Sequence, residues 1–384
     1  MSGAEVVLGT AGVVVLATAL AGAGASALGR QRSRVQALAG MAALGSGVAL
    51  LFALADALLL WSLPRLGLSF GPVRGPALGI VWVVRLGLLG LVGLVAVRAR
   101  GHSWRGAAGL FLLANLALSG GEVYAYVVEP LWIETTYLEV TSGDLEASAP
   151  PVRIVHLTDL HVERYGPREA AVAEQVAALE PDLIVLTGDY LNMSNLSDPA
   201  ALAGFRKLAT QLHAPYGVYA VRGNVDPWPE RMAELVEGTG ITWLEQETAV
   251  VEVRGQRLRL LGVACSWHEQ NIEWLAQTAA GVARDEFTIL LFHSPDLIAE
   301  AAELGIDLYL AGHTHGGQIA LPFYGPVITF SRYGRQYARG EFQVDETTMY
   351  VSRGLGFEGG GAPRARFLAR PEIVVVEVGG AFER

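Results

Sequence analysis

Two histidines stand two residues apart in the run Gly312-His313-Thr314-His315-Gly316-Gly317, directly after a short apolar segment at 307–311. In an extended chain, side chains two residues apart point the same way, so both imidazoles can reach one metal site. The flanking glycines let the backbone adopt positive φ and approach a ligand closely. A pair of surface-loop histidines is the alternative, because imidazole is also a common polar loop residue. The rest of the chain decides between the two interpretations.

Each of four further apolar runs of strand length ends in a potential metal ligand. Continuous apolar runs with helical segments between them predict strands that are buried on both faces. A single Asp at a strand end is usually a cap or turn residue. Five strands that deliver carboxylate, imidazole and amide groups to one edge instead predict a site for divalent metal ions. The four runs lead into Asp159 and His161, into Asp189, into Asn224 and Asp226, and into His293.

The order of these residues along the chain resembles that of the calcineurin-like metallophosphoesterase superfamily. The run at 312–318, Tyr350–Gly356 and Arg370–Ile373 resemble its membrane-associated bacterial branch, and in particular the UDP-2,3-diacylglucosamine pyrophosphatase-like phosphoesterases. The resemblance covers about residues 150–378 and implies a four-layer α/β/β/α sandwich. The motifs that carry it are Asp159-x-His161, Gly188-Asp189, Gly223-Asn224, His293 and Gly312-His313-x-His315.

The resemblance also implies a hydrolase with two divalent metal ions. Such a pair, about 3.5–4 Å apart, holds a bridging hydroxide, neutralises the phosphoryl oxygens and aligns an in-line attack. Mixed nitrogen and oxygen ligation favours Mn, Fe or Zn over Ca or Mg. The implied ligands are Asp159, His161 and His315 for the first ion, and Asn224, His293 and His313 for the second, with Asp189 as the bridge. Asp189, Asn224 and His313 are the catalytic candidates among them.

One position departs from the family pattern. The family usually has a His after Gly-Asn, which is thought to protonate the leaving group, but this chain has Val225. General acid catalysis is typically worth ~10²–10⁴-fold, so alkyl monoesters should be poor substrates. We therefore expect a phosphodiester or pyrophosphate bond in a lipid-linked or nucleotide substrate. His156 and His268 are conceivable substitute acids, although His156 lies within a predicted strand, where a packed core histidine is the simpler interpretation.

Three residues are candidates for substrate contacts: Asn192, His268 and Arg353. Arg suits bidentate phosphate contacts. A structural salt bridge for Arg353, or a turn cap for Asn192, is at least as well supported. A non-catalytic phospholigand-binding membrane sensor is the alternative function, since folds and sites are reused without chemistry. The presence of every expected metal ligand argues against that alternative.

The elements that must position these residues are predicted from periodicity and turn chemistry. Helix and strand alternation followed by a strand-rich tail predicts two packed sheets flanked by helices. The predicted helices are Pro167–Glu180, one that starts at Asp198-Pro199, Asn271–Arg284 and Pro295–Leu304. The further predicted strands are Trp132–Val140, two within Ile241–Val263, Gln318–Leu321, Gln336–Val344, Thr348–Ser352 and Glu372–Val378.

The apolar composition of residues 1–130 predicts a transmembrane region, and the family resemblance implies that residues 131–384 form a metallophosphoesterase domain. Four apolar segments, at about 6–28, 35–61, 77–97 and 107–128, are near or above the ~20 residues that cross a bilayer core. Buried helices of a soluble core are the alternative. The chain opens without a basic region, so no cleaved signal peptide is expected. Ionisable residues within these segments, Asp56, Arg85 and Glu122, should pair inside the helix bundle, or else form a polar groove for a lipid headgroup.

Arginines predict the orientation of these segments. The first and third links carry three each, the middle link carries two, and positive links tend to lie in the cytoplasm. The catalytic domain of a multi-pass plasma-membrane protein would then face outward, which argues against a cytoplasmic nucleotide-linked lipid. Expected partners are the lipid bilayer and a phosphorylated small-molecule or lipid substrate. A net charge of −10 argues against nucleic acid, and a single cysteine excludes an intramolecular disulfide.

Overall fold

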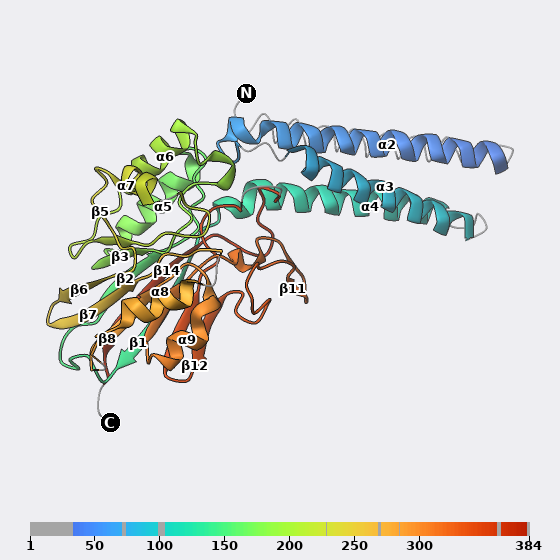
Figure 1. Ribbon diagram of the computed structural model, residues 1–384. Helices are drawn as coiled ribbons and strands as arrows, with labels where there is room; N and C mark the ends of the chain where they lie inside the picture. The colour runs from blue at the N-terminus through green and yellow to red at the C-terminus, as the bar shows by residue number, and fades with distance from the viewer. Residues whose placement is uncertain are drawn as a thin grey trace. The chain divides into compact units, whose positions relative to one another are not determined.

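The computed structural model describes residues 34–70, 74–98, 104–227, 229–267, 270–283, 285–358 and 362–381. The chain forms two compact units, Met1–Val128 and Glu129–Arg384, and each is described here by itself (Figure 1). The first predicted span, at about 6–28, and the candidate His268 lie outside the described residues.

The second unit contains two six-stranded sheets. The first sheet has the order β1-β14-β2-β3-β4-β5, in which the last strand of the chain lies parallel to β1 and antiparallel to β2. The prediction of strands buried on both faces is confirmed for β3, in which every residue is buried, while β2 and β4 each contain one half-buried residue. The strands are β1 (Glu134–Ser142), β2 (Val152–Leu157), β3 (Leu183–Leu186), β4 (Val218–Ala220), β5 (Ile241–Trp243) and β14 (Glu372–Gly380).

The second sheet has the order β12-β13-β9-β8-β7-β6, with parallel strands from β13 to β7 and an antiparallel pair at each edge. A separate two-stranded hairpin, β10 (Ala320–Leu321) and β11 (Gly325–Pro326), follows β9 along the chain. The strands of the sheet are β6 (Glu247–Val253), β7 (Gln256–Gly262), β8 (Phe287–Leu291), β9 (Leu308–Ala311), β12 (Gly340–Val344) and β13 (Thr347–Val351).

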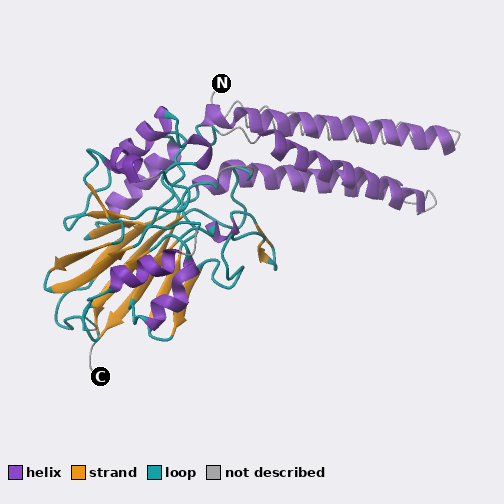
Figure 2. Cartoon of the chain, viewed as in Figure 1, coloured by secondary structure: helices purple, strands orange, loops and turns teal. Residues whose placement is uncertain are grey.

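Three apolar cores hold the layers of this unit together. One lies between the first sheet and its helices, one between the two sheets, and one between the second sheet and its helices. Helices therefore cover both outer faces of the strands (Figure 2), and the predicted mixed α/β architecture is confirmed. The helices are α5 (Pro167–Ala178), α6 (Pro199–Ala209) and α7 (Pro229–Val236) on the first sheet, and α8 (Gln270–Ala279) and α9 (Ile298–Glu303) on the second.

Local chemistry explains where the helices begin and end. Helix α6 begins at Pro199, as predicted, and the Asp198 side chain accepts the backbone N–H of Ala200 at 3.0 Å. Helix α8 ends at Ala279, before the predicted end at 284, because Gly281 takes a left-handed conformation at φ 81°. The eight-residue helix α7 was not predicted, since it is too short to show a helical period.

The described residues of the first unit are mainly helical. The helices are α2 (Arg34–Ser62), the short 3-10 helix η1 (Leu63–Leu66), α3 (Arg74–Arg98) and α4 (Trp104–Val123), which continues as the π-helical turn η2 (Tyr124–Val128). By length and composition, two stretches among the described residues, Gly45–Leu66 and Ala108–Leu131, are able to cross a bilayer, and Ala77–Leu91 is shorter. The prediction of four spans is therefore not confirmed.

A buried cluster around Arg85 joins α2, α3 and α4. Its Nε and Nη2 atoms donate to the two Asp56 oxygens at 2.7 and 2.6 Å, which confirms the predicted pairing of these residues. Nη1 donates to Asn115 Oδ1 at 2.9 Å, and Nη2 also donates to Ser119 and Glu122. Every charge in the cluster therefore has a partner, which is the condition for burying a guanidinium.

Candidate metal centre

The predicted ligands come from the ends of five strands that belong to two different sheets. Strands β2, β3 and β4 of the first sheet lead into Asp159 and His161, into Asp189, and into Asn224. Strands β8 and β9 of the second sheet lead into His293 and into the two histidines of the 312–317 run. The expectation of one shared sheet edge is wrong in this respect. The two sheets pack face to face through a shared apolar core. The carboxyl ends of strands from both sheets therefore lie together at the site.

Five of the predicted ligands have left-handed backbone. Their φ angles are 51° for Asp159, 40° for His161, 58° for Asp189, 69° for His313 and 51° for His315. Positive φ is uncommon in non-glycine residues, and it costs roughly 1–2 kcal/mol for each residue. Such strain clusters at functional sites, where the surrounding structure holds it in place. Here it turns the side chains off the strand ends toward one another.

Glycines make room for the two central carboxylates. A Cβ atom added at Gly223 would collide with the Asp189 side chain, and one added at Gly312 or Gly354 would collide with Asp159. At these three positions the backbone lies so close to the carboxylates that only glycine, which has no Cβ atom, fits. The glycines of Gly223-Asn224 and Gly312-His313 therefore have a steric role.

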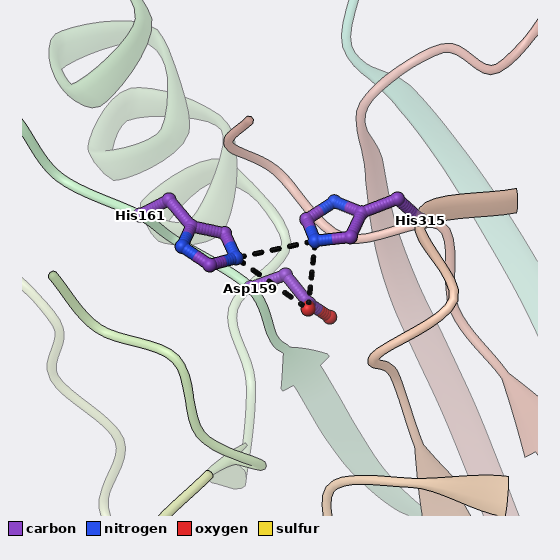
Figure 3. A group of neighbouring side chains, drawn as sticks. All are labelled: Asp159, His161 and His315. Carbon is purple, nitrogen blue, oxygen red and sulfur yellow. Dashed lines mark hydrogen bonds and ion pairs between the residues drawn. The ribbon is translucent and has the colours of Figure 1, made fainter. Parts of the chain in front are cut away.

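One group of ligand atoms consists of Asp159, His161 and His315, all of them buried (Figure 3). His315 Nε2 lies 3.1 Å from His161 Nε2 and 3.2 Å from Asp159 Oδ1, and His161 Nε2 lies 3.8 Å from Asp159 Oδ1. Two imidazole nitrogens and a carboxylate oxygen that converge in this way form a ligand set for a divalent ion.

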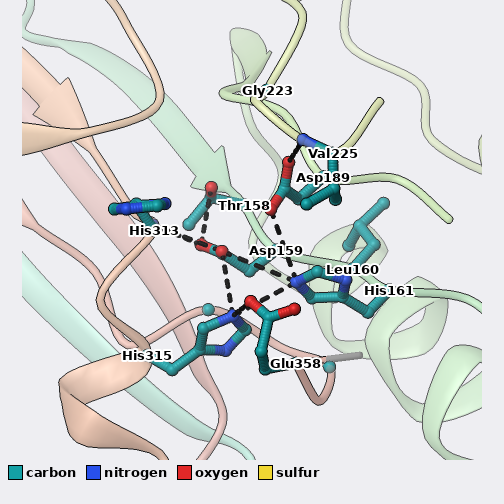
Figure 4. Close-up of polar contacts among 12 residues, drawn as sticks. Thr158, Asp159, Leu160, His161, Asp189, Gly223, Val225, His313, His315 and Glu358 are labelled. Carbon is teal, nitrogen blue, oxygen red and sulfur yellow. Dashed lines mark hydrogen bonds and ion pairs between the residues drawn. The ribbon is translucent and has the colours of Figure 1, made fainter. Parts of the chain in front are cut away.

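A second group consists of Asp159, Asp189 and His293. His293 Nε2 lies 3.1 Å from Asp189 Oδ2 and 3.9 Å from Asp159 Oδ1. Its Nδ1 lies 2.7 Å from the carbonyl oxygen of Thr187, which fixes the ring and leaves Nε2 for the site. Asp189 Oδ2 is also 3.6 Å from His161 Nε2, so this oxygen lies within reach of both groups (Figure 4).

The electrostatics of the site fit a pair of cations. Burial lowers the pKa of His161 to about 3 and raises the pKa of Asp159 to about 6. Burial alone would lower the pKa of His293, but the carboxylates of Asp189 and Asp159 outweigh it and raise the value to about 10. Groups this deeply buried need compensating charge. Two divalent ions would supply it, and the two groups that share Asp159 are the residues that would hold them.

Asn224 and His313 lie beside these two groups. Asn224 Oδ1 is buried and, among the described residues, has no hydrogen-bond partner, which leaves its lone pairs available to a ligand. The His313 ring packs edge-on against His293 at 5.1 Å between centroids, and its backbone N–H donates to Asp159 Oδ2 at 3.0 Å. Both residues line a cavity of about 310 Å³ that is open to solvent.

Two acidic residues at the site are absent from the predicted set of seven metal ligands. Glu358 brings a carboxylate oxygen within 4.8 Å of the ligand atoms of His161 and Asp189, and its Oε2 lies 3.7 Å from His315 Nε2. Asp226 accepts backbone N–H groups from the loops that follow β3 and β4. The sequence signals are weak: Glu358 precedes three glycines, and Asp226 ends the string Gly223-Asn224-Val225-Asp226.

A buried arginine, Arg366, supports His315 from behind. Its Nη2 lies 3.3 Å from His315 Nδ1, and its Nε and Nη1 donate to the carbonyl oxygens of Gly356 and Arg353 at 3.0 and 2.7 Å. Burial lowers the pKa of Arg366 to about 9. This contact turns the other nitrogen of His315 toward Asp159. Sequence reasoning missed Arg366 because it lies 51 residues beyond His315.

Two candidates for substrate contacts, Arg353 and Asn192, and one candidate substitute acid, His156, have structural partners. Arg353 Nη2 donates to Glu372 at 2.8 Å and to Glu134 at 2.9 Å, which is the salt-bridge alternative. Asn192 Oδ1 accepts the backbone N–H of Ser194 at 2.9 Å, which is the cap alternative. His156 is buried in β2 with Nε2 2.7 Å from the Thr187 hydroxyl, and burial lowers its pKa to about 3. The structure thus gives none of the three a place among the clustered ligand atoms.

Comparison with known proteins adds independent findings. The model of the calcineurin-like phosphoesterase family matches residues 152–317. The chain is 32% identical over 283 residues to the uncharacterized metallophosphoesterase YkuE of Bacillus subtilis, covering 71% of this chain and 94% of that protein. It is 29% identical to the phosphodiesterase YaeI of Escherichia coli, covering 69% and 95%. It is 25% identical to the UDP-2,3-diacylglucosamine pyrophosphatase LpxG of Chlamydia trachomatis, covering 66% and 92%.

Proposed function

Because the chain belongs to the calcineurin-like metallophosphoesterase family, and is thus a metal-dependent phosphoric ester hydrolase, we propose that it cleaves a phosphodiester or pyrophosphate bond. The observation that carries this proposal is the pair of buried ligand groups that share Asp159. They gather carboxylates and imidazoles from two sheets within reach of one another. A protein that only binds phosphate has no need of so many strained ligands.

Two divalent ions, when bound, lower the pKa of water and neutralise the phosphoryl oxygens. The chain's own residues would hold and orient these ions. We assign Asp159, His161 and His315 to one ion, and Asn224, His293 and His313 to the other. Asp189, with an oxygen within reach of both groups, is the proposed bridge. The mixed donor set favours Mn, Fe or Zn.

The proposed bond follows from the residue at position 225. Val225 is buried, its backbone N–H donates to Asp189 Oδ1 at 3.2 Å, and its side chain cannot transfer a proton. A leaving group that is already a stable anion, such as a nucleotide phosphate or an acidic alcohol, needs little protonation. The names of YaeI, a phosphodiesterase, and LpxG, a pyrophosphatase, agree with this substrate class.

Membrane anchoring is the second part of the proposal. Residues 1–130 form the anchor, with four spans, and residues 131–384 form the catalytic domain, which faces outward from the plasma membrane. Two described helices have suitable length and composition. A reporter fused after Arg384 should be active only outside the cytoplasm, and cytoplasmic activity would reverse the orientation.

Hydrolysis of bis-p-nitrophenyl phosphate by the purified full chain with Mn²⁺ tests the catalytic part. We expect metal-dependent turnover that Asp189→Asn abolishes. Asp345→Asn is the matched control, because Asp345 is exposed in the β12–β13 turn, where Asn tolerates its φ of 50°. Absence of metal-dependent turnover, with Asp189→Asn indistinguishable from the unmodified protein, would instead favour a non-catalytic phospholigand sensor.

A further inference from the structure

An apolar groove opens beside the metal centre. It has a volume of about 610 Å³, and three residues of the metal centre, His313, His315 and Glu358, form part of its wall. The rest of the wall is largely apolar and includes Trp267, Ile319, Val327, Ile328, Phe330 and Pro363. A phosphate held at the metal centre would therefore have an apolar channel directly next to it.

The segment 321–330, which we call the apolar hairpin, continues the groove to the surface. It contains Leu321 of β10, the whole of β11 and the residues around them, and it projects from the body formed by the two sheets (Figure 2). Six large apolar side chains in this segment are exposed: Leu321, Phe323, Tyr324, Val327, Ile328 and Phe330. Single exposed apolar residues are ordinary, but a cluster of this size marks a contact surface for an apolar partner.

The apolar hairpin is fixed to the metal centre rather than loosely attached. A Cβ atom at Gly317 would lie 2.6 Å from Pro326 Cβ, so β11 packs tightly against the turn that carries His315. The carbonyl oxygen of Phe330 lies 3.4 Å from His313 Nε2. A molecule that fills the groove therefore also lies next to two predicted metal ligands.

Charge at the hairpin favours an anionic amphiphile over a neutral one. The Arg335 guanidinium lies 4.1 Å above the Tyr324 ring and donates to its carbonyl oxygen at 2.9 Å. Arg335 is exposed, so a cation stands at the edge of the aromatic surface. Aromatic and basic groups placed together are typical of surfaces that contact anionic lipids.

We propose that the groove and the apolar hairpin form a subsite for an acyl chain, and that the substrate is a lipid phosphodiester or pyrophosphate. This inference rests on the proposed function, because it places the scissile phosphate at the metal centre. The acyl chain lies along Ile319, Ile328 and Phe330, and the apolar hairpin accepts the part of the lipid that extends beyond the groove. A free nucleotide would leave this apolar wall unused.

Two phosphodiesters that differ only in the length of their alkyl group test the inference. Water cleaves p-nitrophenyl methyl phosphate and p-nitrophenyl hexadecyl phosphate to p-nitrophenolate and the corresponding alkyl phosphate. With the full chain in detergent micelles and Mn²⁺, we expect kcat/KM for the hexadecyl ester to exceed that for the methyl ester at least tenfold. Equal values would overturn the inference while leaving the proposed function intact. Turnover of neither ester would instead overturn the proposed function.

Variants of the groove wall sharpen this test. Ile328→Ser should lower the ratio of the two kcat/KM values several-fold. Phe330→Gly should also lower this ratio several-fold. Because glycine adopts the Phe330 φ of 55° without strain, this variant should preserve the fold. Tyr137→Ser, at an exposed aromatic on β1, is the matched control and should leave the ratio unchanged. An unchanged ratio in both groove variants would overturn the inference.

Photolabelling gives a readout that does not depend on turnover. A phosphodiester with a diazirine at the end of its acyl chain should label the tryptic peptide 285–332, which contains most of the groove wall. Ile328→Ser and Phe330→Gly should reduce this labelling, whereas Tyr137→Ser should not. Labelling confined to other peptides, or to a second copy of the chain, would mean that the groove takes another occupant.

Discussion

The carboxylate of Asp226 accepts the backbone N–H of Asp189, 37 residues earlier in the chain, at 2.7 Å. The same carboxylate accepts the N–H groups of Tyr190 and Gly223, both at 2.8 Å. It thereby ties the loop after β3 to the loop after β4. Those two loops carry the proposed bridging carboxylate and the proposed amide ligand, so Asp226 sets their separation without itself being in either ligand group.

Asp226→Asn should weaken metal binding. An amide replaces one of the two acceptor oxygens with a donor, so at least one of the three loop N–H groups loses its partner. Loss of a group that orients ligands typically costs about 10–100-fold in metal affinity. Isothermal titration of the metal-free protein with Mn²⁺ measures the change, with Asp345→Asn as the control. Affinity equal to that of the unmodified protein would show that the loops hold their positions without Asp226.

Gly354→Ala should disrupt the site far more than a comparable glycine substitution elsewhere. Gly354 has φ 66°, and a Cβ atom there would collide with the Asp159 side chain. Gly240 has φ 77° and nothing within 4 Å of the same added atom. In both variants an alanine must adopt left-handed backbone, which costs roughly 1 kcal/mol. The difference between the two variants therefore measures the effect of the collision with Asp159 alone.

The measurement is Mn²⁺ affinity together with the thermal midpoint of each variant. We expect Gly354→Ala to lose metal binding at least tenfold, while Gly240→Ala keeps the affinity of the unmodified protein. Equal effects on affinity would contradict the steric role assigned to Gly354.

Sequence reasoning found the ligands that stand at the ends of apolar runs, because a strand end is visible in the sequence. Asp159, Asp189 and His293 are of this kind. Glu358 and Arg366 stand in an irregular loop, and only the packing of that loop brings them to His315. The left-handed backbone of the ligands was equally hidden, since Asp and His adopt it more often than most residues but still too rarely to predict it at a single position. The groove depends on a hairpin whose strands have two residues each, too short for any period.

The order of the strands in the sheets could not be predicted from the sequence either. Pairing of β14 between β1 and β2 joins segments more than 200 residues apart, and no local pattern specifies such a partner. The alternation of helices and strands still gave the mixed α/β architecture, because burial on both faces leaves continuous apolar runs such as β3 and β8.

Val225→His should raise activity on alkyl monoesters. A His at this position follows Asn224, and an imidazole with a pKa near neutrality can protonate an alkoxide leaving group. We expect an increase of at least about tenfold on a monoester such as 3-phosphoglycerol, with the ~10²–10⁴-fold contribution of a well-placed general acid as the upper limit.

The hydrolysis of bis-p-nitrophenyl phosphate serves as the internal control, since its leaving group needs little protonation. Its rate should change much less than the monoester rate. An unaltered monoester rate would mean that another residue already supplies the proton.

Asp182 should make the stability of the catalytic domain sensitive to acid. It precedes β3 of the first sheet, and Arg254, in the turn between β6 and β7 of the second sheet, donates to both of its oxygens. Burial alone would raise the pKa of Asp182, but the hydrogen bonds from Arg254 and from the Arg153 backbone hold it below its usual value. The stabilisation is therefore present above the unfolded value of about 3.9, and it is lost as the pH falls through the folded value.

Asp182→Asn should consequently lower the urea midpoint near pH 7 and have a smaller effect near pH 3, because the stabilisation declines below the unfolded value of about 3.9 and is lost completely only below the folded pKa. Tryptophan fluorescence of the full chain in detergent follows the transition at each pH. Arg254→Gln should reproduce the loss near pH 7, and the double variant should add little to either single one, because both remove one contact. A gap between Asp182→Asn and the unmodified protein that stays constant down to pH 3 would exclude this ion pair as the source of the acid sensitivity.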